Sequence, residues 1–121
     1  SETMMNIECI DMPGSELTVK LSGEMDAFGC TKIRTELEQL ANSKEHNLLL
    51  DLSLVTFLDS SGIGLIVFLF KRLKARERSL EMIGVQGQPQ ELIELLRINS
   101  VIPVSLYSES YESQDMNTCA S

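Results

Sequence analysis

Residues 48–52 read Leu-Leu-Leu-Asp-Leu and are bounded by Asn47 and Ser53. A segment this short and this apolar is typical of a strand buried on both faces, as in the middle of a parallel sheet. Along the chain, strand-like segments alternate with segments of helical periodicity. This alternation implies crossover connections, so it predicts a single α/β domain with a mainly parallel sheet.

The remaining elements are expected from periodicity and turn residues. Leu17, Val19 and Leu21 alternate with polar residues, which is typical of a half-buried strand that Gly23 then ends. With the Pro13-Gly14 turn before it, this strand predicts an N-terminal β-hairpin. We expect about four or five strands and three or four helices: strands at 7–12, 17–21, 48–52, 80–85 and 101–106, a loop after 52, helices at 26–43, 61–76 and 89–96, and a short helix near 110–115.

The 121 residues suffice for one domain with its own hydrophobic core. We assign residues 5–107 to this domain. Residues 108–121 are a polar tail, expected to be a short helix or a frayed end. Residues 1–3 precede two methionines and are set aside as a candidate cloning remnant.

Charge and composition exclude several kinds of function. The net charge of −8 opposes nucleic-acid binding, because phosphate backbones repel an acidic protein. The longest apolar run, 63–70, is far shorter than the roughly 20 residues that cross a bilayer, so no direct membrane insertion is expected. Three cysteines without a Cys-x-x-Cys spacing and a single histidine, His46, predict a cytoplasmic protein with reduced thiols and no metal or other cofactor.

Two motifs carry a family resemblance. Residues 48–64 hold an apolar strand ending in Asp-Leu-Ser, a short loop, and then Asp-Ser-Ser-Gly-hydrophobic-Gly at the start of a helix. Residues 22–26 read Ser-Gly-Glu-Met-Asp and match a Gly-Glu-hydrophobic-Asp element. In their order, their separation and the surrounding strand–helix order, these motifs resemble the STAS domain family over roughly residues 5–107.

The resemblance is to the anti-sigma-factor-antagonist type and implies a protein-binding regulator, not an enzyme. In that type, a GHKL-type serine kinase that is itself the anti-sigma factor phosphorylates the first serine of the Asp-Ser-Ser/Thr-Gly motif. A PP2C-type phosphatase reverses the modification. By motif, Ser60 is the phosphoacceptor, and Asp26 lies on a partner-facing surface that we extend to Ile63 and Ile66. We expect a monomer that binds the kinase when Ser60 is unphosphorylated.

The chemistry of a helix start suits this role. The backbone N–H groups of residues 61–63 are expected to point toward a phosphate on Ser60, aided by the positive end of the helix. Gly62 and Gly64 have little bulk, so a partner or a phosphate can approach the backbone closely. A phosphate would add about −1.5 to −2 charge beside Asp59 and could disrupt an interface by repulsion, without a conformational change.

Structural roles are also open for these residues. Ser60 or Ser61 could simply cap the helix, and we favour the cap for Ser61. Asp26 could cap the preceding helix, contact a partner, or do both. Residues 76–79 stand where the family often has glycine, so the turn there is expected to differ.

Two other functions compete. An enzyme could be imagined around Ser60, His46 and either Asp51 or Asp59, but the chain lacks a Gly-x-Ser-x-Gly elbow. The second alternative is a non-phosphorylated STAS subunit that scaffolds a membrane transporter complex. The regulated output is open among sigma-factor control, stress signalling, secretion and biofilm formation.

Overall fold

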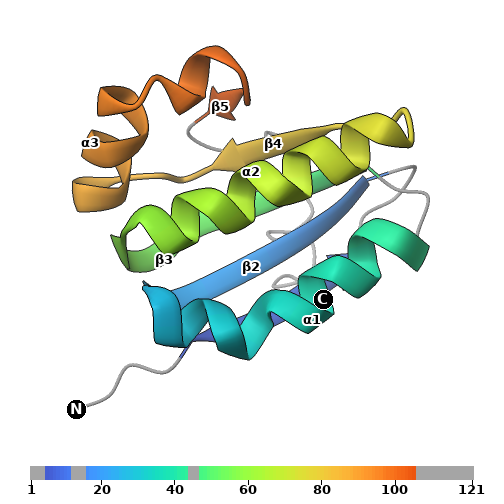
Figure 1. Cartoon of the computed structure of the whole chain (residues 1–121), viewed down its shortest axis with the longest axis horizontal. Coiled ribbons are helices and arrows are strands. Elements are labelled where there is room, and N and C mark those ends of the chain that lie inside the picture. The colour runs from blue at the N-terminus through green and yellow to red at the C-terminus, as the bar shows by residue number, and fades with distance from the viewer. Residues whose placement is uncertain (1–4, 12–15, 44–46, 106–121) are drawn as a thin grey trace, which may run out of the picture.

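The computed structural model describes residues 5–11, 16–43 and 47–105. The predicted Pro13-Gly14 turn, His46 and the tail at 108–121 lie outside these residues, as do residues 1–3. The predicted α/β class is confirmed, with one five-stranded sheet and helices on one side of it (Figure 1).

The sheet has its strands in chain order, β1-β2-β3-β4-β5. β1 and β2 are antiparallel, which confirms the predicted hairpin, and the other neighbouring pairs are parallel. The predicted central strand is buried on both faces, since Leu48 to Leu52 are all buried. The strands are β1 (Asn6–Asp11), β2 (Glu16–Met25), β3 (Asn47–Leu58), β4 (Leu80–Ile83) and β5 (Val104–Ser105).

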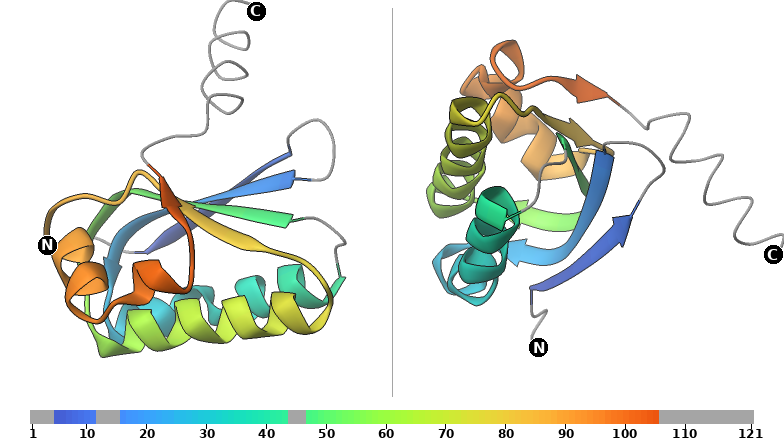
Figure 2. Two further views of the ribbon diagram at one scale, coloured as in Figure 1. Left: turned by 90° about the horizontal axis from the view of Figure 1, so that it is seen from above. Right: turned by 90° about the vertical axis from the view of Figure 1, so that its right-hand side faces the viewer.

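Within the described residues, the helices all cover the same face of the sheet (Figure 2). Strands that follow one another in spatial order are joined by crossovers that progress in one direction, and right-handed crossovers of this kind place their helices on one side. The helices are α1 (Ala27–Ser43), α2 (Ser60–Ala75), α3 (Gly87–Leu95) and the 3₁₀ turn η1 (Ile98–Ser100). Among the described helices, none is long and apolar enough to cross a membrane.

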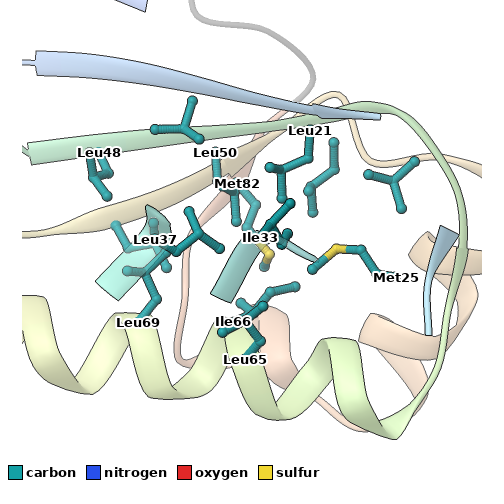
Figure 3. Packing of buried hydrophobic residues seen from close by; sticks show 14 of the residues in the cluster. Leu21, Met25, Ile33, Leu37, Leu48, Leu50, Leu65, Ile66, Leu69 and Met82 are labelled. Atoms are coloured by element: carbon teal, nitrogen blue, oxygen red, sulfur yellow. The ribbon is translucent and has the colours of Figure 1, made fainter. Parts of the chain in front are cut away.

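The main hydrophobic core lies between this helical layer and the sheet (Figure 3). Leu50 of β3 and Leu65 of α2 are both completely buried there. On the opposite face a smaller cluster joins Leu49 and Ile83, with Ile10 packed against it. The alternation of these two sets along β3 and β4 explains why both faces of the central strands are apolar.

Two strands are longer than expected. β2 continues through Gly23 to Met25, because Gly23 adopts a φ of 111° at a register irregularity and does not end the strand. β3 continues through the segment expected to be a loop and ends at Leu58. The last strand is shorter than expected and begins only at Val104, after η1 and Pro103.

The turn after α2 is closed without glycine. Glu77 adopts a left-handed φ of 60°, its N–H donates to the Lys74 carbonyl, and the Arg78 N–H donates to the Leu73 carbonyl. This pattern is the Schellman motif, in which glycine normally takes the left-handed position. Residues 76–79 therefore form the helix-ending turn that glycine would favour. The difference from the family pattern is that Glu77 stands at the glycine position.

We expect Glu77→Gly to stabilise the protein by about 0.5–1 kcal/mol. Glycine relieves the left-handed strain and removes a negative charge from the negative end of α2, and these gains exceed the added entropy of the unfolded chain. Thermal or urea unfolding measures the change. Glu77→Ala removes the same charge but keeps a Cβ, so it should give only the part of the gain that comes from the charge. Equal stabilities for the two variants would contradict a strain-based account.

The basic end of α2 caps a neighbouring helix. The Arg78 guanidinium donates to the Ala41 carbonyl at 2.6 Å and to the Leu40 carbonyl at 3.3 Å, and Arg76 donates to the Asn42 carbonyl at 3.1 Å. α1 has no basic residue in its own last turn. These arginines therefore satisfy carbonyl groups that the end of α1 leaves without helical partners.

Candidate functional site

Ser60 is the first residue of α2 and is exposed. It follows directly on the carboxyl end of β3, beside the carboxyl end of β2, where the Asp59 N–H approaches the Met25 carbonyl at 3.4 Å. The starts of α1 and α2 therefore meet at the same end of the sheet (Figure 1). The predicted residues Asp26 and Asp59 stand at these two helix starts.

The cap of α2 is Asp59, not Ser60 or Ser61. One carboxylate oxygen of Asp59, Oδ1, accepts from the Ser61 N–H at 2.9 Å and from the Gly62 N–H at 3.3 Å. Aspartate, like serine, is among the strongest capping residues. The Ser60 hydroxyl is therefore not needed for the cap, and it is exposed on the surface.

This cap changes the expected setting of a phosphate. The Ser61 and Gly62 N–H groups are bonded to the Asp59 carboxylate, and the Ile63 N–H donates to the Asp59 carbonyl at 3.0 Å. The expectation that these three groups are free to receive a phosphate is therefore wrong for this conformation. An anion on Ser60 would stand beside the Asp59 carboxylate, with the nearest backbone donors already in use.

Asp26 caps α1, which was one of the two roles expected for it, the other being contact with a partner. Its Oδ1 accepts from the Gly29 N–H at 2.8 Å. Within the described part of the chain, no ion-pair partner lies within 4 Å of Asp26 or Asp59. The carboxyl ends of β2 and β3 thus carry two neighbouring capping carboxylates, which makes this end of the sheet acidic.

The pKa of the buried Cys30 thiol of α1 is influenced by both carboxylates. Burial raises its pKa most, Asp59 raises it further, Arg34 opposes the rise, and Asp26 adds to it. The raised pKa keeps the thiol in its neutral form. Because the starts of α1 and α2 meet at one end of the sheet, we treat Asp26 and Asp59 as one acidic site around Ser60.

Gly62 is buried and tightly packed, so its lack of a side chain serves the fold. A Cβ at Gly62 would clash with the Leu58 side chain and would lie 2.7 Å from the Met25 carbonyl oxygen. Gly64 is exposed, and a Cβ there would have nothing within 4 Å. The expected open approach to the backbone therefore applies at Gly64 and not at Gly62.

The two isoleucines of the expected partner surface differ. Ile66 is only 2% exposed and points into the core (Figure 3), so its side chain cannot contact a partner and we remove it from that surface. Helical periodicity explains this, because Ile66 shares a face with the buried Gly62 and Leu69. Ile63 is half-buried and packs partly against the core.

Sequence reasoning missed three residues at this end of the sheet. Phe28 is 68% exposed in the first turn of α1 and Phe57 is 39% exposed near the end of β3. Exposed aromatic side chains are typical anchors of protein interfaces. Gln88, at the start of α3, contacts Leu58 through its side chain. The exposure of the two phenylalanines and the contact of Gln88 with a residue 30 positions away are not visible in any local sequence pattern.

The enzyme alternative named Asp51 and His46 beside Ser60. The Asp51 carboxylate is buried and accepts from the Ser53 N–H at 2.9 Å, and His46 lies outside the described residues. In the described ranges no three His, Cys, Asp or Glu side chains gather as metal ligands. A cavity of about 340 Å³ is lined by α3, η1, β5 and Val85, and the motif around Ser60 is not part of its lining.

A family model described as "Mlab, STAS domain" matches residues 9–104 of the chain. The anti-sigma-B factor antagonist of Listeria monocytogenes is 27% identical over 100 residues, which cover 83% of this chain and 88% of that protein. The name of that relative states what it antagonises.

Solved structures show the same fold. An anti-sigma factor antagonist from Mycobacterium paratuberculosis superposes with a TM-score of 0.80 at 18% identity, covering 90% of this chain and 92% of that one. The Bacillus cell fate determinant SpoIIAA, solved in its phosphorylated form, gives a TM-score of 0.68 at 15% identity, covering 89% and 98%. At these identities the likeness concerns the fold.

Proposed function

The chain belongs to the STAS domain family, as its two motifs predicted, and on this basis we propose that it is a phosphorylation-switched protein-binding regulator. In this proposal the unphosphorylated protein binds a serine kinase of the anti-sigma, GHKL type. Phosphorylation of Ser60 releases it, and a PP2C-type phosphatase restores binding. The protein acts as a cytoplasmic monomer and carries out no catalysis itself.

The exposed Ser60 hydroxyl beside a cap already completed by Asp59 carries this proposal. Because Asp59 satisfies the helix start, Ser60 can be modified without removing a hydrogen bond on which the fold depends. A relative of the same fold has been solved in a form described as phosphorylated. The listerial relative, named for its antagonism of an anti-sigma factor, supports the choice of partner.

Charge distribution supports repulsion as the switching mechanism. The basic side chains of α2 begin at Lys71, eleven residues after Ser60, which at 1.5 Å per residue is about 16 Å along the helix. That distance exceeds the screening length of about 8 Å at physiological salt. On α1, Arg34 pairs with Glu38 at 3.8 Å and Lys32 lies over the Phe28 ring, so both side chains already have partners. A phosphate would therefore add nearly its full charge to the acidic end of the sheet.

A phosphate-affinity gel of the protein from its own cells tests the proposal. We expect two bands from the wild-type protein, with the slower band absent from Ser60→Ala. Ser61→Ala is the matched control, because it removes the adjacent hydroxyl and leaves Ser60 and the Asp59 cap in place. Its slower band should persist.

A single unshifted band under all growth conditions would contradict the switch. Stable co-purification with the subunits of a transporter would then favour the alternative of a scaffold that is never phosphorylated. A slow band that disappears in Ser61→Ala and persists in Ser60→Ala would move the phosphoacceptor to Ser61.

A further inference from the structure

In the part of the chain that the structure describes, the end of β3 next to Ser60 has no neighbouring strand on the β4 side. β4 pairs with β3 only from Leu48 to Asp51, and within the described residues β3 then continues alone on that side to Leu58. Gly84, at a φ of 73°, turns the chain away, and a Cβ there would lie 2.8 Å from the Ser53 Cβ. Backbone groups on this free edge need other hydrogen-bond partners.

Two glutamine side chains supply those partners. Gln86 Nε2 donates to the Ser53 carbonyl at 2.9 Å. Gln88 Oε1 accepts from the Leu58 N–H at 2.8 Å, while its Nε2 donates to the Leu58 carbonyl at 2.7 Å. A carboxamide offers a donor and an acceptor in one plane, so it reproduces what a paired backbone residue would present. Gln88 therefore replaces a missing strand at the last residue of β3.

Leu58 is two residues before Ser60, and its attachment determines where the helix start lies. On the β2 side the turn follows a strand that stays paired with β2 up to Leu58, and its Asp59 N–H approaches the Met25 carbonyl at 3.4 Å. On the α3 side it is held by the two short Gln88 bonds. The Asp59–Ser60 turn is therefore attached on both sides, and on the α3 side the attachment is a single side chain.

We propose that Gln88 is a positioning residue for Ser60, so that α3 helps to set the geometry in which kinase, phosphatase and binding partner meet the hydroxyl. The biological consequence rests on the proposed function, whereas the positioning itself is a property of the isolated protein. Gln88 acts through Leu58 and does not touch the reacting hydroxyl. Its role is local, so its loss should loosen residues 58–63 more than the rest of the sheet.

Amide hydrogen exchange of the purified full chain tests the positioning. In Gln88→Ala we expect exchange at Leu58, Ser61 and Gly62 to be about tenfold faster, since two hydrogen bonds of ordinary net strength are lost. Exchange at Leu50, in the centre of β3, should change much less. Gln90→Ala is the matched control, because Gln90 lies on the same helix and, among the described residues, its side chain bonds only to Glu94, at 3.2 Å.

Gln88→Glu separates hydrogen bonding from packing, because it keeps the shape of the side chain. A protonated glutamic acid can still donate to the Leu58 carbonyl, but a carboxylate cannot. The Leu58 and Asp59 amide chemical shifts should therefore resemble those of the wild type at low pH and depart from them as the pH rises through the carboxyl pKa, which is normally about 4.3. Shifts that do not depend on pH would overturn the hydrogen-bonding role.

The phosphate-affinity gel then measures the consequence. With Ser60 phosphorylated in the wild type, the slow band should form about tenfold more slowly in Gln88→Ala than in Gln90→Ala, on the same hydrogen-bond reasoning. Equal rates would overturn the proposal, as would unchanged exchange at 58–63 or faster exchange by one common factor throughout the chain. If the wild type shows no slow band, the proposed function fails, and the exchange experiment alone decides the role of Gln88.

Discussion

Ser60→Asp should weaken capture of the binding partner by about tenfold or more, whereas Ser60→Ala should bind like the unphosphorylated protein. An aspartate at Ser60 adds a carboxylate beside Asp59, whose own carboxylate already occupies the nearest backbone donors. Juxtaposed like charges at an interface cost up to several kcal/mol, and about 1.4 kcal/mol is tenfold in affinity. The partner is first isolated from native cells on immobilised Ser60→Ala, and affinities are then measured by calorimetry.

Ser60→Asn is the matched control for that experiment, because asparagine has the size of aspartate without its charge. If repulsion is the mechanism, Ser60→Asn should bind much closer to Ser60→Ala than to Ser60→Asp. All three variants should unfold at nearly the same temperature, since Ser60 is exposed and the Asp59 cap is intact. Equal affinities for Ser60→Ala and Ser60→Asp would contradict the switch, and equal loss in Ser60→Asn and Ser60→Asp would replace repulsion by steric exclusion.

Much of the fold could be predicted because hydrophobic periodicity reports burial directly. The leucines of 48–52 are buried on both faces, and the alternation of strands and helices leads to the observed parallel sheet. The second half of β3 could not be predicted in the same way. Between Val55 and Leu58, two residues that both face the core, two exposed residues intervene at a register irregularity, so the period of two is broken.

The candidate site was predictable to the level of its motif and no further. Asp59, Ser60 and Ser61 are all good capping residues in a row, so propensity alone cannot say which of them caps the helix. The structure selects Asp59, because α2 begins at Ser60. Gln88 has no counterpart in any local pattern, because its two bonds reach across 30 residues to an edge that exists only when β4 is shorter than β3. The hydrogen bonds between Gln88 and the Leu58 backbone therefore could not be predicted from the sequence.

Gly62→Ala should destabilise the protein by roughly 1–3 kcal/mol, the usual cost of overpacking a close contact. The added methyl group would meet the Leu58 side chain and lie 2.7 Å from the Met25 carbonyl oxygen and 3.0 Å from the Met25 Cβ. A carbonyl in a strand cannot move aside as a flexible side chain can, so α2 itself must shift away from β2. The gain in helix propensity from glycine to alanine, about 1 kcal/mol, offsets only part of this cost. Urea unfolding measures the difference.

Gly64→Ala is the internal control, because both glycines lie in the first turns of α2 and only Gly64 has open space around a Cβ. Alanine there should stabilise the protein by up to about 1 kcal/mol, since the propensity gain is not opposed by any contact. The two substitutions are chemically identical and two residues apart, yet they should change the free energy of unfolding in opposite directions. A stabilising Gly62→Ala would mean that the start of α2 can move away from β2 at little cost. The close packing of Met25 against Gly62 would then no longer explain why Ser60 has a fixed place beside Asp26.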